Sequence, residues 1–377
     1  MADTRRNAQP DRYARHNLID WFSQDAVRAA RIGVIGAGAI GNEVVKNLVL
    51  LGAGEIDVYD FDQVELHNLT RSIFLRESDV GQSKAQALVR RAAEVDPNVR
   101  LRAIEGDFWQ TLHFDRLRAY TALIVCVDNF EARIRANQLA LLAGVDMVNA
   151  AIDSRFATVE TYPFGSTPRQ DPAPACYECS LPASVYQRLA ARYSCGGLKR
   201  IAQSERKVPT TTLTASIAGA FAANAALRFG TMPTIAEQPA ARTFTDTRSG
   251  TSSVIRVARA ALCAGCSATP HRPPIISGLP PRDAGEVARL AEPIIWRYRC
   301  TRCADSAAIQ DESARHELQP ASRFDERIAR CARCHEQSVQ IEFRDALPLG
   351  ELLSRYDGRT IPVRYLLAAD QCFDLQG

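Results

Sequence analysis

The chain has 377 residues, of which 46% are hydrophobic and 24% are charged, and its formal net charge is +3 at pH 7. This composition supports a sizeable core, and at roughly 150 residues per domain the length predicts two or three domains. The small net charge argues against a nucleic-acid or membrane-surface partner, and the lack of a long apolar run or an N-terminal signal peptide favours a cytoplasmic protein.

The first 150 residues alternate between short apolar runs and stretches with helical periodicity. The apolar runs predict strands, at 31–36, 55–60, 99–104, 121–127 and 146–151. The stretches between them predict helices, at about 37–51, 80–95 and 129–143. Strands that alternate with helices predict an α/β fold, with a parallel sheet covered by helices on both faces.

The rest of the chain is less regular. Its features are, in order, a loop at 163–175, a short helix near 183–191, a Gly-, Lys- and Arg-rich crossing segment at 194–208, a long helix of small residues from Pro209, and a β-hairpin within 242–260. A Pro-rich stretch follows, which is typical of a linker. We therefore divide the chain into a domain at 1–268 with a crossover segment at about 180–212, a linker at 269–294, and a small C-terminal module with its tail at 295–377.

Three glycines after the first predicted strand form a G-x-G-x-x-G pattern, at Gly36, Gly38 and Gly41. Such a loop lets backbone N–H groups and the positive end of a helix approach phosphates. Asp60 ends the next predicted strand, where a carboxylate can bind ribose hydroxyls. On its own this pattern predicts a dinucleotide site, and glycines that serve only a tight turn are the simpler alternative.

Further polar residues follow the predicted strands, namely Asp62, Asn68, Arg71, Lys84, Asp128 and Asn129. Hydride transfer does not need additional cations and carboxylates around the phosphates, so an NAD-linked oxidoreductase is disfavoured. Attack of a carboxylate on the α-phosphate of ATP brings two anions together, and fixed cations offset that repulsion. A carboxylate at the end of a strand, such as Asp128, is suited to Mg²⁺.

The series GAGAIG, DFDQVELHNLTR, DVGQSKA and CVDNFEAR resembles the adenylation domain of ThiF, MoeB and the ubiquitin-activating enzymes. The resemblance covers about residues 12–266 and is closest to the compact activating enzyme of the ubiquitin-fold modifier and its counterparts in bacterial antiphage operons. It implies a Rossmann-like adenylation domain that binds ATP and Mg²⁺. His16 and Ser72 depart from the family, which usually has Gln at both positions.

The resemblance also implies roles for individual residues. Asp60 and Asp62 would contact adenosine or its phosphates, and Asp128 would bind Mg²⁺. The phosphate-binding residues would be Asn68, Arg71 and Lys84. The opening Arg12-Tyr13-Ala14-Arg15 is similar to a family segment whose second arginine reaches the ATP of the partner protomer. Arg15 therefore implies a homodimer.

Eight of the eleven cysteines form four C-x-x-C pairs. Without a secretion signal, this spacing favours tetrahedral Zn²⁺ over disulfides. One set matches the structural zinc site of the family, namely Cys176, Cys179, Cys263 and Cys266. The other set lies outside the resemblance and fits a zinc ribbon, with His335 as a competing ligand and reduced buried thiols as an alternative; it comprises Cys300, Cys303, Cys331 and Cys334.

Cys195 is the candidate nucleophile. It lies in the predicted crossing segment before the sequence Pro-Thr-Thr, and the compact activating enzymes that the chain resembles carry their thioester cysteine at this place. Lys199 and Arg200 would favour the thiolate. A loop cysteine without a role is the alternative. Cys126 ends a predicted buried strand and is expected to be core, and Cys372 has no assignment.

These features predict an enzyme that adenylates the C-terminal carboxylate of a ubiquitin-like protein, forms a thioester on Cys195 and passes the modifier to a conjugating enzyme, as in a bacterial antiphage pathway. One alternative is adenylation of a sulfur carrier protein for thiocarboxylate formation. Another is a zinc-bearing binding scaffold with a degenerate nucleotide site. The expected partners are proteins, with neither nucleic acid nor membrane among them.

Overall fold

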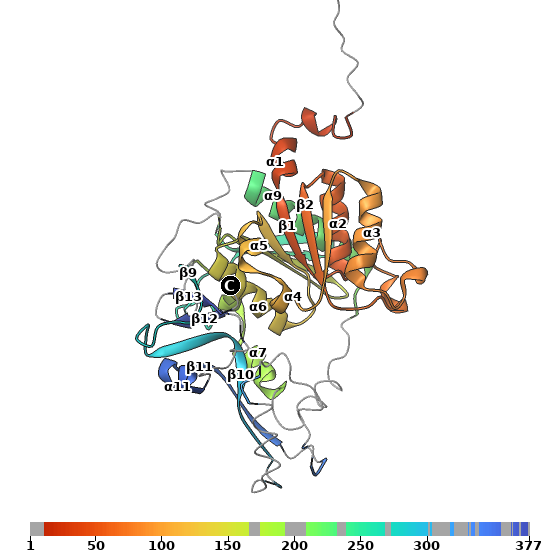
Figure 1. Ribbon diagram of the computed structural model, residues 1–377. Coiled ribbons are helices and arrows are strands. Elements are labelled where there is room, and N and C mark those ends of the chain that lie inside the picture. Colours follow the sequence, from red (N-terminus) through yellow and green to blue (C-terminus); the bar gives the residue numbers. More distant parts are fainter. Residues whose placement is uncertain are drawn as a thin grey trace, which may run out of the picture. The chain divides into compact units, whose positions relative to one another are not determined.

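The computed structural model describes residues 11–165, 174–192, 209–231, 239–267 and 273–300, and in the C-terminal part residues 302–303, 317–319, 331, 333–335, 339–355, 363, 365–368 and 371–375. The chain forms two compact units (Figure 1). The first comprises Met1–Cys179 and Val208–Cys266, and the second comprises Ser180–Lys207 and Ser267–Gly377. The domain boundaries expected from the sequence remain a prediction.

The first unit is built on an eight-stranded sheet with the order β3-β2-β1-β4-β5-β6-β7-β8. Five strands are parallel, namely β1 (Arg31–Ile35), β2 (Glu55–Asp60), β3 (Arg100–Glu105), β4 (Ala122–Val125) and β5 (Met147–Ile152). Three strands continue the sheet in antiparallel pairing, namely β6 (Phe156–Tyr162), β7 (Ala241–Asp246) and β8 (Thr251–Arg256). All four residues of β4 are buried, as expected for a strand covered on both faces.

Helices alternate with the parallel strands, as the sequence predicts (Figure 1). The helices of this unit are α1 (Gln24–Ala29), α2 (Ala39–Leu51), α3 (Lys84–Val95), α4 (Phe108–Thr111), α5 (Phe114–Arg118), α6 (Phe130–Ala143) and α9 (Thr212–Thr231). Short 3₁₀ turns lie at η1 (His16–Leu18), η2 (Leu66–Asn68), η3 (Glu77–Asp79) and η4 (Tyr177–Ser180). The expected Rossmann-like α/β fold is therefore confirmed.

Two helix starts differ from the sequence prediction. The third helix begins at Lys84 instead of residue 80, because Gly81 has a φ of +84° and Ser83 caps the helix. The long helix of small residues begins at Thr212, three residues after Pro209. Its alanines pack closely on α2 and on the sheet, with Ala218, Ala222 and Ala226 in the same core as α2.

The second unit holds a five-stranded sheet with the order β11-β10-β12-β13-β9. Its elements are β9 (Ile275–Ser277), β10 (Val287–Cys300), β11 (Val339–Pro348), β12 (Tyr365–Ala368), β13 (Gln371–Asp374), α7 (Ala183–Arg192) and α11 (Leu349–Arg355). Residues 269–294, expected to be a linker, contain β9 and the first half of β10. Pro293 lies in β10 where the register with β11 shifts between Arg289 and Ile294, and such irregularities are places where a strand tolerates proline.

Among the described residues, no helix has both the length and the apolar character that crossing a membrane requires.

Candidate functional site

The glycine loop lies between β1 and α2, and each glycine has a different reason to be there. A Cβ at Gly36, where φ is +101°, would lie 2.9 Å from the Cys126 carbonyl oxygen. A Cβ at Gly41 would lie 1.9 Å from the Gly36 carbonyl oxygen. At Gly38, the N-cap of α2, a Cβ would meet no atom within 4 Å. The loop is therefore closed by packing on one side and open at the helix N-terminus, where an anion can approach.

Asp60 braces this loop. Its two carboxylate oxygens accept the backbone N–H of Ala37 at 2.6 Å and of Asp62 at 2.7 Å. Burial raises the pKa of the Asp60 carboxyl, and the two N–H donors partly offset that effect. Asp60 thus joins the end of β2 to the end of β1, and a contact from it to ribose stays a prediction.

Lys84 lies beside the same strand end. Its Nζ is 2.8 Å from the Asp62 carboxylate, and its backbone N–H donates to the Asp62 carbonyl at 2.9 Å. The side chain is only 12% exposed, because the chain at Gln63 pairs with Ser83. A cation is therefore fixed at the carboxyl end of β2, where a phosphate would compete with Asp62 for it.

Asn68 and Arg71 belong to the turn that follows. The buried Asn68 accepts the Glu65 backbone N–H at 2.9 Å, and the Arg71 guanidinium donates to the His67 carbonyl at 2.8 Å. Both contacts are local to the turn. Their expected contacts with phosphates stay predictions.

Asp128 and Asn129 follow β4, the neighbour of β1. Asn129 is the N-cap of α6 and accepts the Ala132 N–H at 2.8 Å, which occupies one of its oxygen lone pairs. Asp128 is exposed. Since β1 and β4 are adjacent parallel strands, Asp128 and the glycine loop lie at the same edge of the sheet, which we call the carboxyl edge.

Arg15 lies on the other edge. The Tyr13 hydroxyl donates to the Asp96 carboxylate, and the Arg12 guanidinium donates to the Val95 carbonyl at 2.7 Å. A Cβ at Gly52 would lie 2.4 Å from the Tyr13 ring, so only glycine leaves room for it. Gly52 and Asp96 precede β2 and β3, so the segment that carries Arg15 is fixed at the amino edge. The structure therefore does not bring Arg15 to its own glycine loop.

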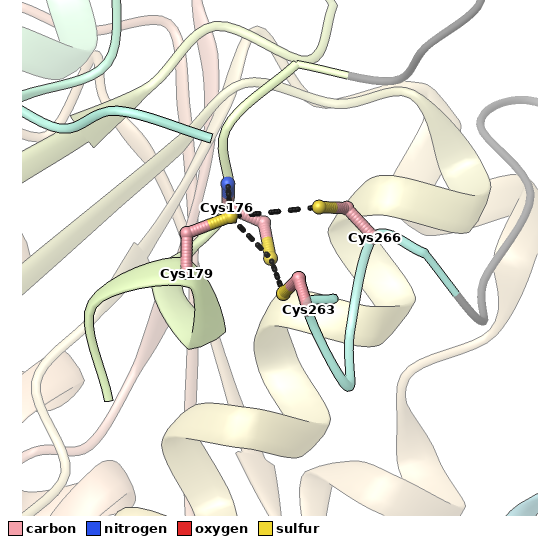
Figure 2. Close-up of side chains that lie close together, drawn as sticks. All are labelled: Cys176, Cys179, Cys263 and Cys266. Carbon is pink, nitrogen blue, oxygen red and sulfur yellow. Dashed lines mark hydrogen bonds between the residues drawn. The ribbon is translucent and has the colours of Figure 1, made fainter. Parts of the chain in front are cut away.

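Four cysteines meet beside α6 (Figure 2). The sulfur–sulfur distances are 3.6 Å for Cys176–Cys263, 3.9 Å for Cys176–Cys179 and 3.5 Å for Cys179–Cys266. Zn–S bonds of about 2.3 Å place tetrahedral sulfurs about 3.8 Å apart, so the four thiolates fit zinc and leave no position for a substrate. Cys176, Cys263 and Cys266 are buried.

The second unit has a similar cluster. The sulfurs of Cys300 and Cys334 are 3.8 Å apart, and those of Cys303 and Cys331 complete a group within 4.8 Å. His335 is exposed and, among the described residues, does not belong to the group. Its φ is +56° and its N–H donates to the Cys331 carbonyl, which forms a tight turn around the last pair. These four sulfurs also fit a zinc ion.

Cys195 lies outside the described residues, and its expected role stays a prediction. Of the two other cysteines, Cys126 is fully buried, and burial raises the pKa of its thiol to about 12. It is therefore a neutral thiol at physiological pH and not a nucleophile. Cys372 is buried in β13.

Two further residues shape the site and were missed by the sequence analysis. Asn42 is fully buried in α2, donates to the carbonyls of Ala37 and Gly38, and accepts the Phe74 N–H at 3.0 Å. Arg133 is buried in α6 and donates to the carbonyls of Val127 and Ala150. Asn42 could have been recognised in the sequence, because it is a lone polar residue at an apolar position of the helix pattern.

The amino-acid sequence is similar to those of several characterised proteins. A sulfur carrier protein adenylyltransferase of Thermus thermophilus is 31% identical over 46% of this chain and 64% of its own length. SUMO-activating enzyme subunit 2 of Dictyostelium discoideum is 29% identical over 44% of this chain and 24% of its own length. The chain thus spans less than two thirds of these curated relatives.

Among solved structures, the crystal structure of Escherichia coli MccB with ATP is similar with a TM-score of 0.55 and 21% identity, over 69% of this chain and 75% of MccB. At this identity the similarity shows the fold alone. The model of the ThiF family matches residues 11–266, which is more than half of the chain. The chain therefore belongs to the ThiF family.

Proposed function

We propose that the chain uses ATP to adenylate the C-terminal carboxylate of a small protein with the ubiquitin fold. The observation that carries this proposal is the carboxyl edge, where the open helix N-terminus at Gly38, the cation of Lys84 and the carboxylate of Asp128 lie on neighbouring strand ends. The names of the relatives mention sulfur-carrier and SUMO activation, which agrees with a protein substrate.

The first step needs positive charge at the phosphates. The substrate carboxylate attacks the α-phosphorus of ATP, the bond to the bridging oxygen breaks, and pyrophosphate leaves as the acyl-adenylate forms. The N-terminus of α2 and Lys84 would stabilise the charge that builds up on the phosphates, with Arg71 as a further cation. Asp128 would hold Mg²⁺, which supplies charge neutralisation at the pyrophosphate.

The second step concerns the acyl group. In our proposal the Cys195 thiolate attacks the acyl carbon, AMP leaves, and the modifier is held as a thioester until a conjugating enzyme accepts it. The resemblance of the region around Cys195 to the compact activating enzymes supports this step. The same resemblance supports a place in a bacterial antiphage pathway.

A second candidate is activation of a sulfur carrier protein, which the relative from Thermus thermophilus favours. In that case a sulfur nucleophile such as sulfide attacks the acyl carbon of the adenylate, AMP leaves, and the carrier protein ends in a thiocarboxylate. Both candidates share the first step, so a test has to follow the fate of the acyl group.

The test is mass spectrometry of the non-reduced protein after incubation with ATP, Mg²⁺ and a ubiquitin-like protein that ends in glycine, for the wild type and for Cys195→Ala. We expect a thiol-sensitive adduct of one modifier mass in the wild type alone. An adenylated modifier without an adduct in either protein would remove Cys195 from the mechanism and favour the sulfur carrier. A protein that produces neither would support a scaffold with a degenerate nucleotide site.

We also propose that each chain holds two structural zinc ions, one in each group of four cysteines. Elemental analysis should give two zinc ions per wild-type chain and one in the double variant Cys300→Ser/Cys303→Ser. Cys372→Ser is the matched control, since Cys372 is a buried cysteine of the same unit outside the group, and it should keep both ions. One ion in the wild type would contradict the second site.

A further inference from the structure

The strand β8 is the last strand at one edge of the eight-stranded sheet, and this edge is not protected against pairing with another strand. Within the described part of the chain it pairs only with β7, and all six of its residues are exposed. Val254 is 67% exposed and Ile255 is 48% exposed. Edge strands present unpaired N–H and C=O groups, and proteins normally protect them with charges, prolines or bulges. Apart from Arg256 at its end, β8 has none of these.

The opposite edge of the same sheet shows the contrast. The strand β3 carries charged residues at Arg100, Arg102 and Glu105. Arg102 donates to the Asp57 carboxylate at 2.9 Å, and Glu105 accepts from Gln86 at 3.0 Å. One edge is thus protected and the other is not, which indicates that a partner covers β8 in use.

The pairing of β7 with β8 identifies the backbone groups that face outward. The Val257 N–H donates to the Ala240 carbonyl, so the residues of β8 at odd positions exchange hydrogen bonds with β7. The residues at even positions therefore direct their N–H and C=O groups to the free edge. These residues are Ser252, Val254 and Arg256.

The direction of β8 fixes how a partner strand would deliver its end. β7 runs parallel to β1–β5, so β8 starts at the carboxyl edge and runs away from it. A strand that pairs antiparallel to β8 runs toward the carboxyl edge, and its C-terminal continuation emerges there. The partner strand would lie six strand positions from β1, the strand that the glycine loop follows. That separation is about 29 Å, which about nine extended residues can span.

Cations lie along that route. Arg155 and Arg248 are exposed on the two turns at the carboxyl edge that precede β6 and β8. The Arg155 guanidinium is paired with the Asp246 carboxylate, and the backbone N–H of Arg248 donates to the same carboxylate at 2.9 Å. The exposed side chain of Arg248 is therefore the cation here that complements a chain end with a free carboxylate.

We propose that β8 is the docking edge for a β-strand of the protein substrate, which pairs antiparallel to β8 and passes its C-terminal tail along the carboxyl edge to the glycine loop. This inference rests on the proposed function. It adds where the substrate binds, in which direction its strand runs, and that a tail of about nine residues is needed.

The test uses Val254→Pro in the full chain with Val254→Ala as the matched control. Proline removes the outward N–H and projects its ring from the free edge, while the ladder with β7 stays intact. Alanine removes the side chain and keeps the N–H. With a ubiquitin-like protein that ends in glycine, we expect Val254→Pro to raise the KM for that protein in ATP–pyrophosphate exchange by roughly tenfold over Val254→Ala, with the maximal exchange rate within about twofold.

Hydrogen exchange of the wild type gives a second readout that does not depend on a variant. The amides of Ser252, Val254 and Arg256 should become protected when the ubiquitin-like protein is added. No change in protection and no change in KM, in a protein that does exchange pyrophosphate, would overturn the docking proposal alone. A wild type that exchanges no pyrophosphate would contradict the proposed function instead. Protection that depends on the concentration of the chain itself would assign the edge to a second copy and also overturn the proposal.

Discussion

Lys84, which we propose binds the phosphates of ATP, is held in place by a neighbouring carboxylate. Its ion pair with Asp62 holds the ammonium beside the end of β2, so no ordering of a long side chain is needed when phosphates arrive. We predict that Lys84→Ala lowers the rate of pyrophosphate exchange by roughly a hundredfold or more. Lys46→Ala is the control, because Lys46 is also paired with a carboxylate, that of Glu43, but lies on α2 away from the loop. Equal loss in both variants would indicate a general effect of lysine removal.

Tyr13 is predicted to matter for stability, with a pH dependence that follows from Asp96. Burial opposes ionisation of Asp96, but the hydrogen bonds from Tyr13 and Asn98 outweigh it, so the pKa of the carboxyl is lowered. The stabilisation is therefore complete above the ordinary carboxyl pKa of about 3.9 and is lost as pH falls through the lowered value. Urea denaturation should show that Tyr13→Phe reduces the free energy of unfolding by about 1–2 kcal/mol at pH 7, and by less at pH 3.

The position of the nucleotide loop could be predicted from the sequence, while the contacts of its residues could not. The glycine spacing and the strand before it are local patterns. That the Asp60 oxygens accept the N–H groups of Ala37 and Asp62 was not predicted, and its contact with ribose stays a prediction. That Asn129 caps α6 was not predicted either, and its contact with the nucleotide also stays a prediction. Such contacts depend on which chain segments meet, and a pattern along one segment does not contain that information.

In the first unit, helices α2 and α9 pack closely against each other. A Cβ at Gly219 would lie 2.4 Å from the Glu43 Cβ, so the helices approach only because Gly219 has no side chain. We predict that Gly219→Ala lowers the free energy of unfolding by about 1–3 kcal/mol. Gly350→Ala is the control, since a Cβ in α11 would meet no atom within 4 Å, and it should be neutral or slightly stabilising. Thermal denaturation compares the two.

The strands show why an element can escape sequence analysis. Parallel strands such as β4 are continuous apolar runs and were predicted. The strand β6 was not, because it carries the buried Glu160, which is compensated by Arg242 and Asn149. Arg242, which forms the ion pair with Glu160, lies about eighty residues away in the sequence. The first half of β10 was hidden for another reason, because the prolines around it are typical of a linker.

At the scale of the whole molecule, Arg15 is far from the glycine loop of its own chain. It is fixed at the amino edge of its own sheet, so we propose that it serves the site of a partner protomer. Arg15→Ala and Lys84→Ala should each be inactive as pure dimers. Mixed after subunit exchange, they should recover about a quarter of wild-type activity, because half of the dimers are mixed and each has one intact site. No recovery in a mixture that is shown to contain mixed dimers would contradict an action in trans.

The most direct test of the proposed function is exchange of labelled pyrophosphate into ATP with the wild-type chain and a ubiquitin-like protein that ends in glycine. Reversible adenylation predicts exchange with the intact substrate and none when its C-terminal carboxylate is converted to an amide. Exchange that does not depend on the carboxylate, or no exchange from a folded protein that binds ATP, would contradict adenylation of a protein C-terminus.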